Sequence, residues 1–301
     1  MTAQLPQATI VFTAHNRREM VLDAVALARR QSVPVEIIVC DDASGDGLAE
    51  AMAAAHPDIR FLRSETPRGP CYHRNRGLEA ASCPIVFPLD DDSMLVSPRT
   101  IAQALEEFAD PRVALVAMPF RNIHSSDAIL QRREGEQRQV SVNFAACAHG
   151  VRKDAALQAG GFPEDYFYMG EEGDLAIRLI SADWRVVLGR SDPIDHLQPA
   201  FRRAYKPDFH GRRNTLLFYA RHAPARALPL RLAGALFNNL RFGLRNDCLK
   251  AGILGSVSGL VAAWHTRALR APVSARCFTA FIACKKAECM PLDEFEALLG
   301  D

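Results

Sequence analysis

The stretch Ile85-Val86-Phe87-Pro88-Leu89-Asp90-Asp91-Asp92 is the most informative part of the chain. An apolar run leads directly into three aspartates, and adjacent like charges repel one another. A divalent cation offsets that repulsion when the triplet lies at the carboxyl end of a buried strand. Mg²⁺ and Mn²⁺ favour carboxylate oxygens and often bind substrate phosphates at the same time. The stretch therefore indicates either a metal site or an acidic loop that follows a strand.

The 301-residue chain has the composition of an ordinary globular protein. Apolar residues make up 49% and charged residues 24%, which excludes a disordered chain. The length allows one large domain or two smaller ones. The eight cysteines include no CxxC pair, and the short polar segment before residue 8 does not have the character of a signal peptide. We therefore expect a cytoplasmic chain with free thiols and no zinc site.

The net charge of +1 hides an uneven distribution of charge. Between Arg202 and Lys286 there are 16 Lys or Arg and two acids, so an acidic body carries a basic tail. The tail lacks regularly interleaved aromatic residues, and we expect no nucleic-acid partner. Its basic residues alternate with apolar helical segments, which favours peripheral attachment to the anionic inner face of a membrane. A packed helical subdomain and an oligomer interface are the alternatives.

Strands and helices alternate along the first part of the chain. The predicted strands cover residues 8–13, 35–40, 59–62, 85–89, 113–118 and 184–188, and the predicted helices between them cover 18–30, 48–55, 75–81, 98–108 and 152–159, with one more ending at 182. This alternation predicts an α/β fold with a mostly parallel sheet covered by helices. We interpret residues 121–140 as a loop or insertion. The predicted domains are residues 1–205 and a basic, largely helical region over 206–301.

Two further acidic clusters lie at predicted element ends. Asp41 and Asp42 follow the second strand, where a carboxylate either accepts hydrogen bonds from a nucleotide or makes an Asx turn. Glu171, Glu172 and Asp174 open a helix, and the helix dipole alone favours acids there. Ligands of parallel sheets bind beyond the carboxyl ends of the strands. We therefore expect Asp42 and the triplet to share one crevice.

Five pieces of the chain, in family order, resemble the family 2 glycosyltransferases, which have the GT-A fold and invert the anomeric centre. They are Thr9 to Arg17, with His15 in place of the usual Tyr; Glu36 to Ser44; Gly69 with Arg74 to Leu78; Leu89 to Asp92; and Gly170 to Leu175. The resemblance covers residues 8–200 and implies that the predicted domain over 1–205 is a GT-A catalytic domain that binds a nucleotide-sugar.

The resemblance also implies roles for individual residues. The implied donor-binding residues are Thr13, His15, Arg17, Asp41, Asp42, Arg74, Asp90, Asp91 and Arg212. The implied ligands of Mn²⁺ or Mg²⁺ are Asp90, Asp92 and His196, although the triplet permits two registers and His196 is equally a structural histidine. Glu172 is the implied general base, with Glu171 and Asp174 as alternatives because the family more often carries Asp there.

The function implied by the resemblance is inverting transfer of a hexosyl or deoxyhexosyl group. The donor is a nucleotide-diphosphate sugar, and the acceptor is a hydroxyl of a glycan or a lipid-linked sugar, as in polysaccharide biosynthesis at the cell envelope. The alternatives are a sugar-nucleotide-binding protein without transferase activity and a sugar-phosphate nucleotidyltransferase. The latter carries a Gly-rich basic loop after its first strand, and residues 15–18 do not have that character.

Overall fold

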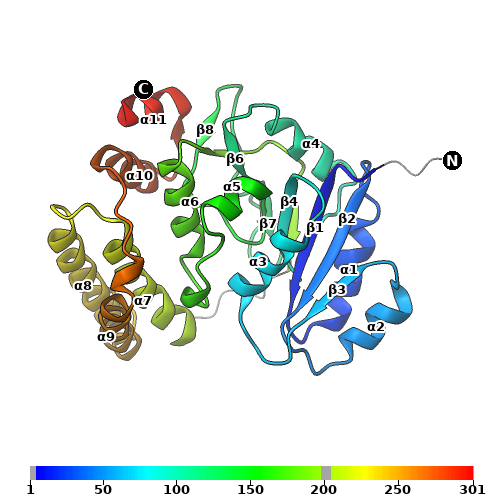
Figure 1. Ribbon diagram of the computed structural model, residues 1–301, viewed down its shortest axis with the longest axis horizontal. Coiled ribbons are helices and arrows are strands. Elements are labelled where there is room, and N and C mark those ends of the chain that lie inside the picture. The colour runs from blue at the N-terminus through cyan, green and yellow to red at the C-terminus, as the bar shows by residue number, and fades with distance from the viewer. Residues whose placement is uncertain (1–4, 198–204, 301) are drawn as a thin grey trace.

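The computed structural model describes residues 5–197 and 205–300. The strands are β1 (Ala8–Ala14), β2 (Val35–Asp41), β3 (Arg60–Arg63), β4 (Ile85–Asp90), β5 (Ser93–Met94), β6 (Val113–Ala117), β7 (Phe120–Asn122), β8 (Gln139–Val140), β9 (His149–Arg152), β10 (Arg185–Leu188), β11 (Ile194–His196) and β12 (Met290–Pro291). The α-helices are α1 (Arg18–Ala28), α2 (Leu48–Ala55), α3 (Pro70–Ala80), α4 (Thr100–Glu107), α5 (Lys153–Gln158), α6 (Glu171–Ser181), α7 (Tyr205–His222), α8 (Leu228–Arg245), α9 (Leu249–His265), α10 (Ala275–Ala287) and α11 (Leu292–Leu299). Figure 1 shows their arrangement.

A nine-stranded sheet of order β12-β8-β10-β6-β9-β4-β1-β2-β3 forms the centre of the molecule. Within the described sheet, only β8 and β9 run against the other strands. A smaller three-stranded sheet has the order β5-β11-β7. The predicted α/β fold with a mostly parallel sheet is therefore confirmed.

The carboxyl ends of three neighbouring strands lie level with one another. Thr13 of β1 is in register with Cys40 of β2 and with Asp90 of β4, and Ala14 pairs with Asp41. Every residue of β1 is buried, as expected for a parallel strand covered on both faces. The alignment brings the ends of the apolar runs, and the acids that follow them, to one edge of the sheet.

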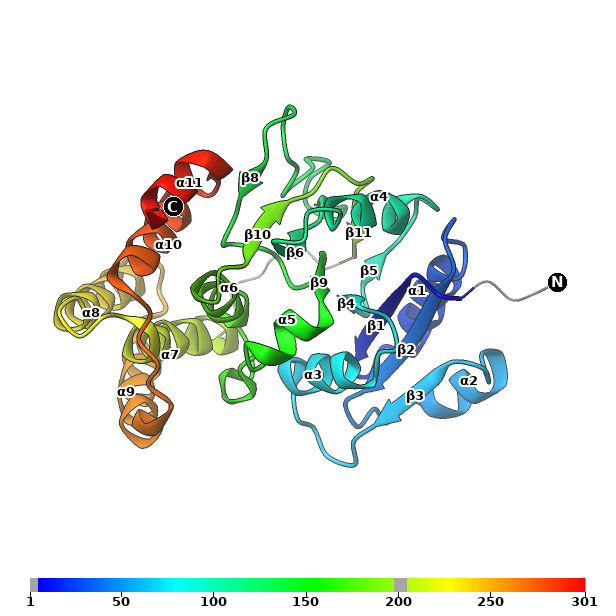
Figure 2. The same cartoon turned by 45° about the horizontal axis from the view of Figure 1, so that its top comes forward.

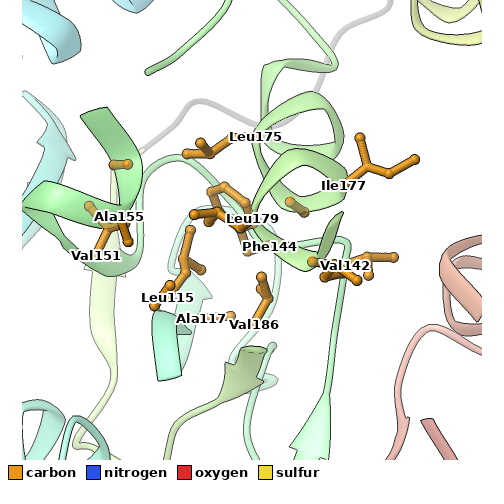
Figure 3. Close-up of a cluster of buried hydrophobic side chains, with 14 of the residues drawn as sticks. Leu115, Ala117, Val142, Phe144, Val151, Ala155, Leu175, Ile177, Leu179 and Val186 are labelled. Carbon is orange, nitrogen blue, oxygen red and sulfur yellow. The ribbon is translucent and has the colours of Figure 1, made fainter. Parts of the chain in front are cut away.

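Two hydrophobic clusters cover the two faces of the sheet. Alternate residues of β1 belong to different clusters, with Ile10 and Phe12 in one and Val11 in the other. Figure 3 shows part of the latter cluster, in which Leu175 and Leu179 of α6 lie above the strands β6 and β10. Because successive side chains of a strand point to opposite faces, β1 packs against the helices on both sides of the sheet.

The segment Arg74 to Leu78 packs α3 closely on the sheet. A Cβ atom added at Gly77 would lie 2.2 Å from Cγ1 of Val11, so only glycine fits there without a shift. The side chain of Asn75 donates to the carbonyl of Phe162 at 2.9 Å and accepts from its N–H at 2.7 Å. These residues anchor α3 between β1 and the turn that precedes α6.

The structure differs from the predicted elements in a few places. The helix predicted over 75–81 begins at Pro70, a residue well suited to a first helical position. Short strands β7 and β8 lie at the two ends of the segment interpreted as a loop. The antiparallel β9 was missed because four residues give little periodic signal. Its Gly150 is required, since a Cβ atom there would lie 2.5 Å from the ring of Phe87.

The C-terminal region has two parts. Helices α7, α8 and α9 pack together, and Figures 1 and 2 both show α8 and α9 at the end of the molecule opposite α2. The chain then returns to the sheet, where β12 pairs with β8 and Phe281 and Phe295 are buried in the cluster that contains Leu115. Among the described helices, none is both long and apolar enough to cross a membrane.

Candidate active site

A cavity of about 470 Å³ lies at the carboxyl ends of β1 and β4. The predicted site residues that line it are Thr13, His15, Arg17, Asp42, Arg74, Asp90, Asp91, Asp92, Glu171, Glu172 and His196. Asp41, Asp174 and Arg212 do not line it. A larger cavity of about 600 Å³ lies at the amino ends of β2 and β3 and contains none of the predicted site residues. The smaller cavity, where acids from all three clusters meet, is therefore the candidate active site.

Asp90, Asp92 and His196 form a group that can hold a metal ion, because their ligand atoms all lie within 4.8 Å of one another. The small sheet places His196 opposite Ser93 on β5 and Asn122 on β7. The Nδ1 atom of His196 lies 2.7 Å from Oδ1 of Asn122, so Nδ1–H donates to the amide oxygen. The Nε2 atom lies 3.2 Å from Oδ1 of Asp92, to which it donates when the imidazole is protonated, and its lone pair can ligate a cation there when the imidazole is neutral. Two carboxylates and one oriented imidazole fit Mn²⁺, and the carboxylates also suit Mg²⁺.

Asp91 differs from its two neighbours in its contacts. Its carboxylate pairs with Arg17 at 3.0 Å and faces the backbone N–H of His15 at 3.4 Å. Burial raises the pKa of Asp91 to about 7, against the effect of Arg17. Burial also opposes ionisation of Asp92, but the hydrogen bonds from His196 and Arg17 outweigh it and lower its pKa. Within the triplet, Asp90 and Asp92 are thus directed toward His196, and Asp91 lies outside this group.

Arg74 connects the triplet to the helix that carries the predicted base. Its buried guanidinium lies 2.6 Å from Oδ1 of Asp90 and 3.1 Å from Oε1 of Glu171. Burial alone would lower the pKa of Arg74, but these two carboxylates outweigh it and raise the pKa. Because both ends of the guanidinium contact carboxylates, Arg74 fixes the distance between β4 and the start of α6.

Glu172 lies at the start of α6 and is half-buried in the wall of the cavity. Burial, with the nearby charge of Glu171, raises the pKa of Glu172 to about 8. A carboxylate with a pKa near neutrality is suited to general base catalysis. Glu172 also lines a second cavity of about 220 Å³, whose wall includes Thr215 of α7 and Lys285 of α10. One carboxylate is therefore shared by two cavities.

Asp174 makes structural contacts away from the cavity. Its carboxylate accepts hydrogen bonds from Nε of Arg178 at 2.8 Å and from Nε2 of His222 at 2.7 Å. Burial opposes its ionisation, but these partners outweigh it and lower the pKa of Asp174 to about 2. The contacts join α6 to α7, and Asp174 does not line the cavity of about 470 Å³.

The second acidic cluster also makes internal contacts. Asp41 is fully buried, and its Oδ1 accepts from the N–H of Ser44 at 3.2 Å, a local contact within the turn that follows β2. Asp42 lines the cavity, and its carboxylate accepts from the N–H groups of Arg68 and Gly69 at 2.6 and 3.0 Å. His73 lies 2.9 Å from the same carboxylate. Asp42 thus fixes the loop before α3 at the edge of the cavity.

Arg212 lies on α7, and its guanidinium carbon is 4.0 Å from the centre of the Phe242 ring on α8. The neighbouring Asn214 has a role that the sequence did not predict. Its amide donates to the carbonyls of Tyr168 and Met169 at 2.8 and 2.7 Å. Met169 has a φ of 71°, so this side chain holds a strained loop in place directly before α6.

Asn122 and His73 were also missed among the residues that support the site. Asn122 lies at the edge of the segment interpreted as a loop, and its place beside His196 depends on strand pairing. His73 lies on α3 and contacts Asp42 across 31 positions of sequence. The available signal for His73 was its place directly before Arg74 of a quoted motif, whereas Asn122 lies far from every quoted motif and carried no such signal.

Residues 9–160, half of the chain, match the family model described as Glycosyl transferase family 2. The chain belongs to glycosyl transferase family 2, so the predicted family and class of enzyme are confirmed.

Two curated relatives resemble this chain. It is 33% identical over 177 residues to the pre-mycofactocin glycosyltransferase of Mycobacterium tuberculosis, a match that covers 53% of this chain and 36% of that protein. It is also 33% identical over 127 residues to the succinoglycan biosynthesis protein ExoO of Rhizobium meliloti, which covers 41% of this chain and 36% of the relative. The matched part is thus about a third of the length of each relative.

Two solved structures share the fold. The mannosyltransferase PcManGT of Pyrobaculum calidifontis, solved in complex with GDP-Man and Mn²⁺, gives a TM-score of 0.58 at 18% identity and covers 99% of this chain and 87% of that one. Residues 1–349 of S. aureus TarS give a TM-score of 0.63 at 14% identity and cover 98% and 90%. At these identities the likeness shows the fold alone.

Proposed function

We propose that this chain is an inverting, metal-dependent glycosyltransferase that uses a nucleotide-diphosphate sugar. The observation that carries the proposal is the cavity in which the Asp90, Asp92 and His196 group and the half-buried Glu172 lie together. The neighbours with this fold support it, since one was solved with GDP-Man and Mn²⁺ and TarS was also solved with UDP-GlcNAc.

Asp90, Asp92 and His196 would hold Mn²⁺ or Mg²⁺, whose charge offsets the charge that develops on the leaving nucleotide diphosphate. Arg17 lies beside them with 40% of its side chain exposed, so its guanidinium can turn from Asp91 and Asp92 to a bound diphosphate. The buried Arg74 acts as a positioning residue because it holds Asp90 and Glu171 in place. Thr13, His15 and Asp42 complete the proposed donor-binding wall.

Glu172 is the proposed general base. Its carboxylate takes the proton from an acceptor hydroxyl, and the acceptor oxygen attacks the anomeric carbon. The bond between that carbon and the diphosphate oxygen breaks on the opposite face, so the configuration inverts. Because Glu172 lines both cavities, we place the donor in the cavity of about 470 Å³ and the acceptor in the cavity of about 220 Å³.

The proposed acceptor is a hydroxyl of a glycan or of a lipid-linked sugar. The name of the R. meliloti relative, a succinoglycan biosynthesis protein, supports a glycan. The second cavity offers polar groups for such an acceptor from Asn143, Thr215 and Lys285. Asp41, Asp174 and Arg212 are left out of the proposed site because each makes its contacts elsewhere in the fold.

The test combines ligand stabilisation with turnover. Nucleotide diphosphates and their sugars are screened with Mn²⁺ by thermal shift, because a ligand that binds the native state raises its stability. Glu172→Gln should keep the shift but lose transfer by about 10²- to 10⁴-fold, the usual contribution of a general base. Asp92→Ala should lose the Mn²⁺-dependent part of the shift. Glu79→Gln, at an exposed position on α3, is the matched control and should behave as wild type.

Three results would contradict the proposal in different ways. A Glu172→Gln enzyme with a near-normal rate removes Glu172 as the base. Donor binding without transfer to any acceptor or to water in the wild-type chain favours the sugar-nucleotide-binding alternative. Formation of a nucleotide-sugar from a nucleoside triphosphate and a sugar phosphate, with release of pyrophosphate, identifies a nucleotidyltransferase instead.

A further inference from the structure

Helices α8 and α9 present a broad apolar face to the outside of the molecule. We call it the α8–α9 face. Its most exposed large side chains, each more than half accessible, are Leu230, Phe237, Leu244, Val257, Val261 and Trp264. On each helix these positions recur at helical spacing, so each helix carries an apolar stripe. Large apolar patches of this kind on a protein surface mark a contact with a partner or a membrane.

Helix α9 buries small residues and exposes large apolar ones, the opposite of an ordinary surface helix of a soluble protein. Its inward face consists of small residues, and a Cβ atom added at Gly255 or Gly259 would lie 2.6 or 2.7 Å from backbone carbonyls of α7. Its large apolar side chains point outward, with Trp264 68% exposed. A helix on a protein core normally buries its large apolar residues. Small residues inward and large apolar residues outward is the arrangement that helices adopt in apolar surroundings.

Charge distinguishes a membrane from a second copy of the chain as the occupant of this face. The exposed cations beside the apolar stripe are Arg241, Arg245, Lys250 and Arg267. Between residues 209 and 287 the only acid is Asp247. Two copies that met through this face would bring like charges together, whereas anionic headgroups attract each such cation.

We propose that the α8–α9 face docks in the plane of an anionic phospholipid bilayer. The apolar side chains enter the boundary between headgroups and acyl chains, and the flanking Arg and Lys contact phosphate groups. Neither helix crosses the bilayer, in agreement with the lack of a spanning helix among the described elements. The inference stands apart from the proposed reaction, because it depends only on this surface. Helix α7 lines the second cavity and packs against α8 and α9.

The test is co-sedimentation of the full chain with vesicles. We expect the chain to sediment with vesicles of phosphatidylcholine and phosphatidylglycerol in equal parts at low salt, and to remain in the supernatant with phosphatidylcholine alone. High salt should release it, because surface charges are then screened. The double variant Phe237→Glu, Trp264→Glu should bind at least about tenfold more weakly. It replaces two apolar side chains that would enter the bilayer by carboxylates, which the anionic headgroups repel. Val96→Glu, at an exposed apolar position after β5, is the matched control and should bind as wild type.

Unchanged melting temperatures would show that the variants fold. A second double variant, Arg241→Gln, Arg245→Gln, removes two cations and adds no charge to the apolar side chains. It should also bind the anionic vesicles more weakly. The proposal is overturned by a wild-type chain that stays in the supernatant with the anionic vesicles at low salt. It is also overturned if both pairs of variants bind as wild type. A wild-type dimer that the Phe237→Glu, Trp264→Glu variant converts to monomer, with no vesicle binding by either, assigns the face to a second copy instead.

Discussion

The Nδ1 atom of His196 lies 2.7 Å from the Oδ1 atom of Asn122, its neighbour across the pairing of β11 with β7. This contact fixes the tautomer and the direction of the imidazole. If His196 helps to hold the cation, Asn122→Leu should weaken Mn²⁺ binding by about 10- to 100-fold. Titration calorimetry measures the affinity. His124→Leu, an exposed position in the same segment, is the control, and equal affinities in both variants would remove Asn122 from this role.

The pKa of Glu172, about 8, predicts how transfer depends on pH. A base must be deprotonated, so kcat/KM should rise with pH up to about 8 and then level off. Glu171 contributes to the raised pKa, and Glu171→Gln should therefore move the rise to lower pH. A pH profile at saturating metal measures both. If the rise stays in place or moves to higher pH in Glu171→Gln, the group that titrates is not Glu172.

Asp174 predicts a stability effect rather than a catalytic one. Asp174→Asn removes the buried carboxylate that Arg178 and His222 both contact. It should lower the free energy of unfolding by about 3 to 5 kcal/mol. Its folded pKa of about 2 lies below the ordinary 3.8, so its contribution is present at neutral pH and is lost as the pH falls toward 2. Denaturant unfolding measures the change. Asp58→Asn, at an exposed ion pair, is the control and should leave the stability close to that of wild type.

Two glycines in helices predict opposite effects of the same substitution. Gly77→Ala forces a methyl group against Val11 and should destabilise the fold by about 1 to 3 kcal/mol. Gly234 of α8 has no atom within 4 Å of its added Cβ, so Gly234→Ala should stabilise by about 1 kcal/mol through helix propensity. Thermal and denaturant unfolding of the two variants measure the difference. A Gly77→Ala protein as stable as wild type would mean that α3 can move away from β1.

The sequence predicted the parallel half of the sheet because its strands are continuous apolar runs that end in acids or turns. Ala8–Ala14, Val35–Asp41 and Ile85–Asp90 all have this character, and the structure places each within one or two residues of the predicted bounds. The short strands at Phe120–Asn122 and His149–Arg152 have no such signal. Their existence depends on partners far away in the sequence, which a local pattern does not contain.

The same limit applies to the candidate site. Strand ends were enough to expect that Asp42 and the triplet share one crevice, and the family resemblance implied that Glu172 acts beside them. The sequence left open whether Asp41 or Asp42 would contact the local backbone, and it did not indicate that His222 would engage Asp174, because that contact depends on how distant helices pack. Neighbouring acids in one motif can therefore differ in role, because some of them are already paired with buried side chains or backbone groups of the fold.

The pairing of β12 with β8 affects how the sheet is completed during synthesis and how the chain can be shortened for expression. Met290 and Pro291 supply the outermost strand of a sheet whose first strand begins at Ala8, and Phe295 closes the hydrophobic layer behind it. While a ribosome is still translating the chain, the backbone edge of β8 therefore stays unpaired until residues 290 and 291 emerge. A shortened form that stopped near residue 205 would retain every proposed ligand and the proposed base. It would also leave that edge of β8 unpaired, so expression trials should keep residues 206–300.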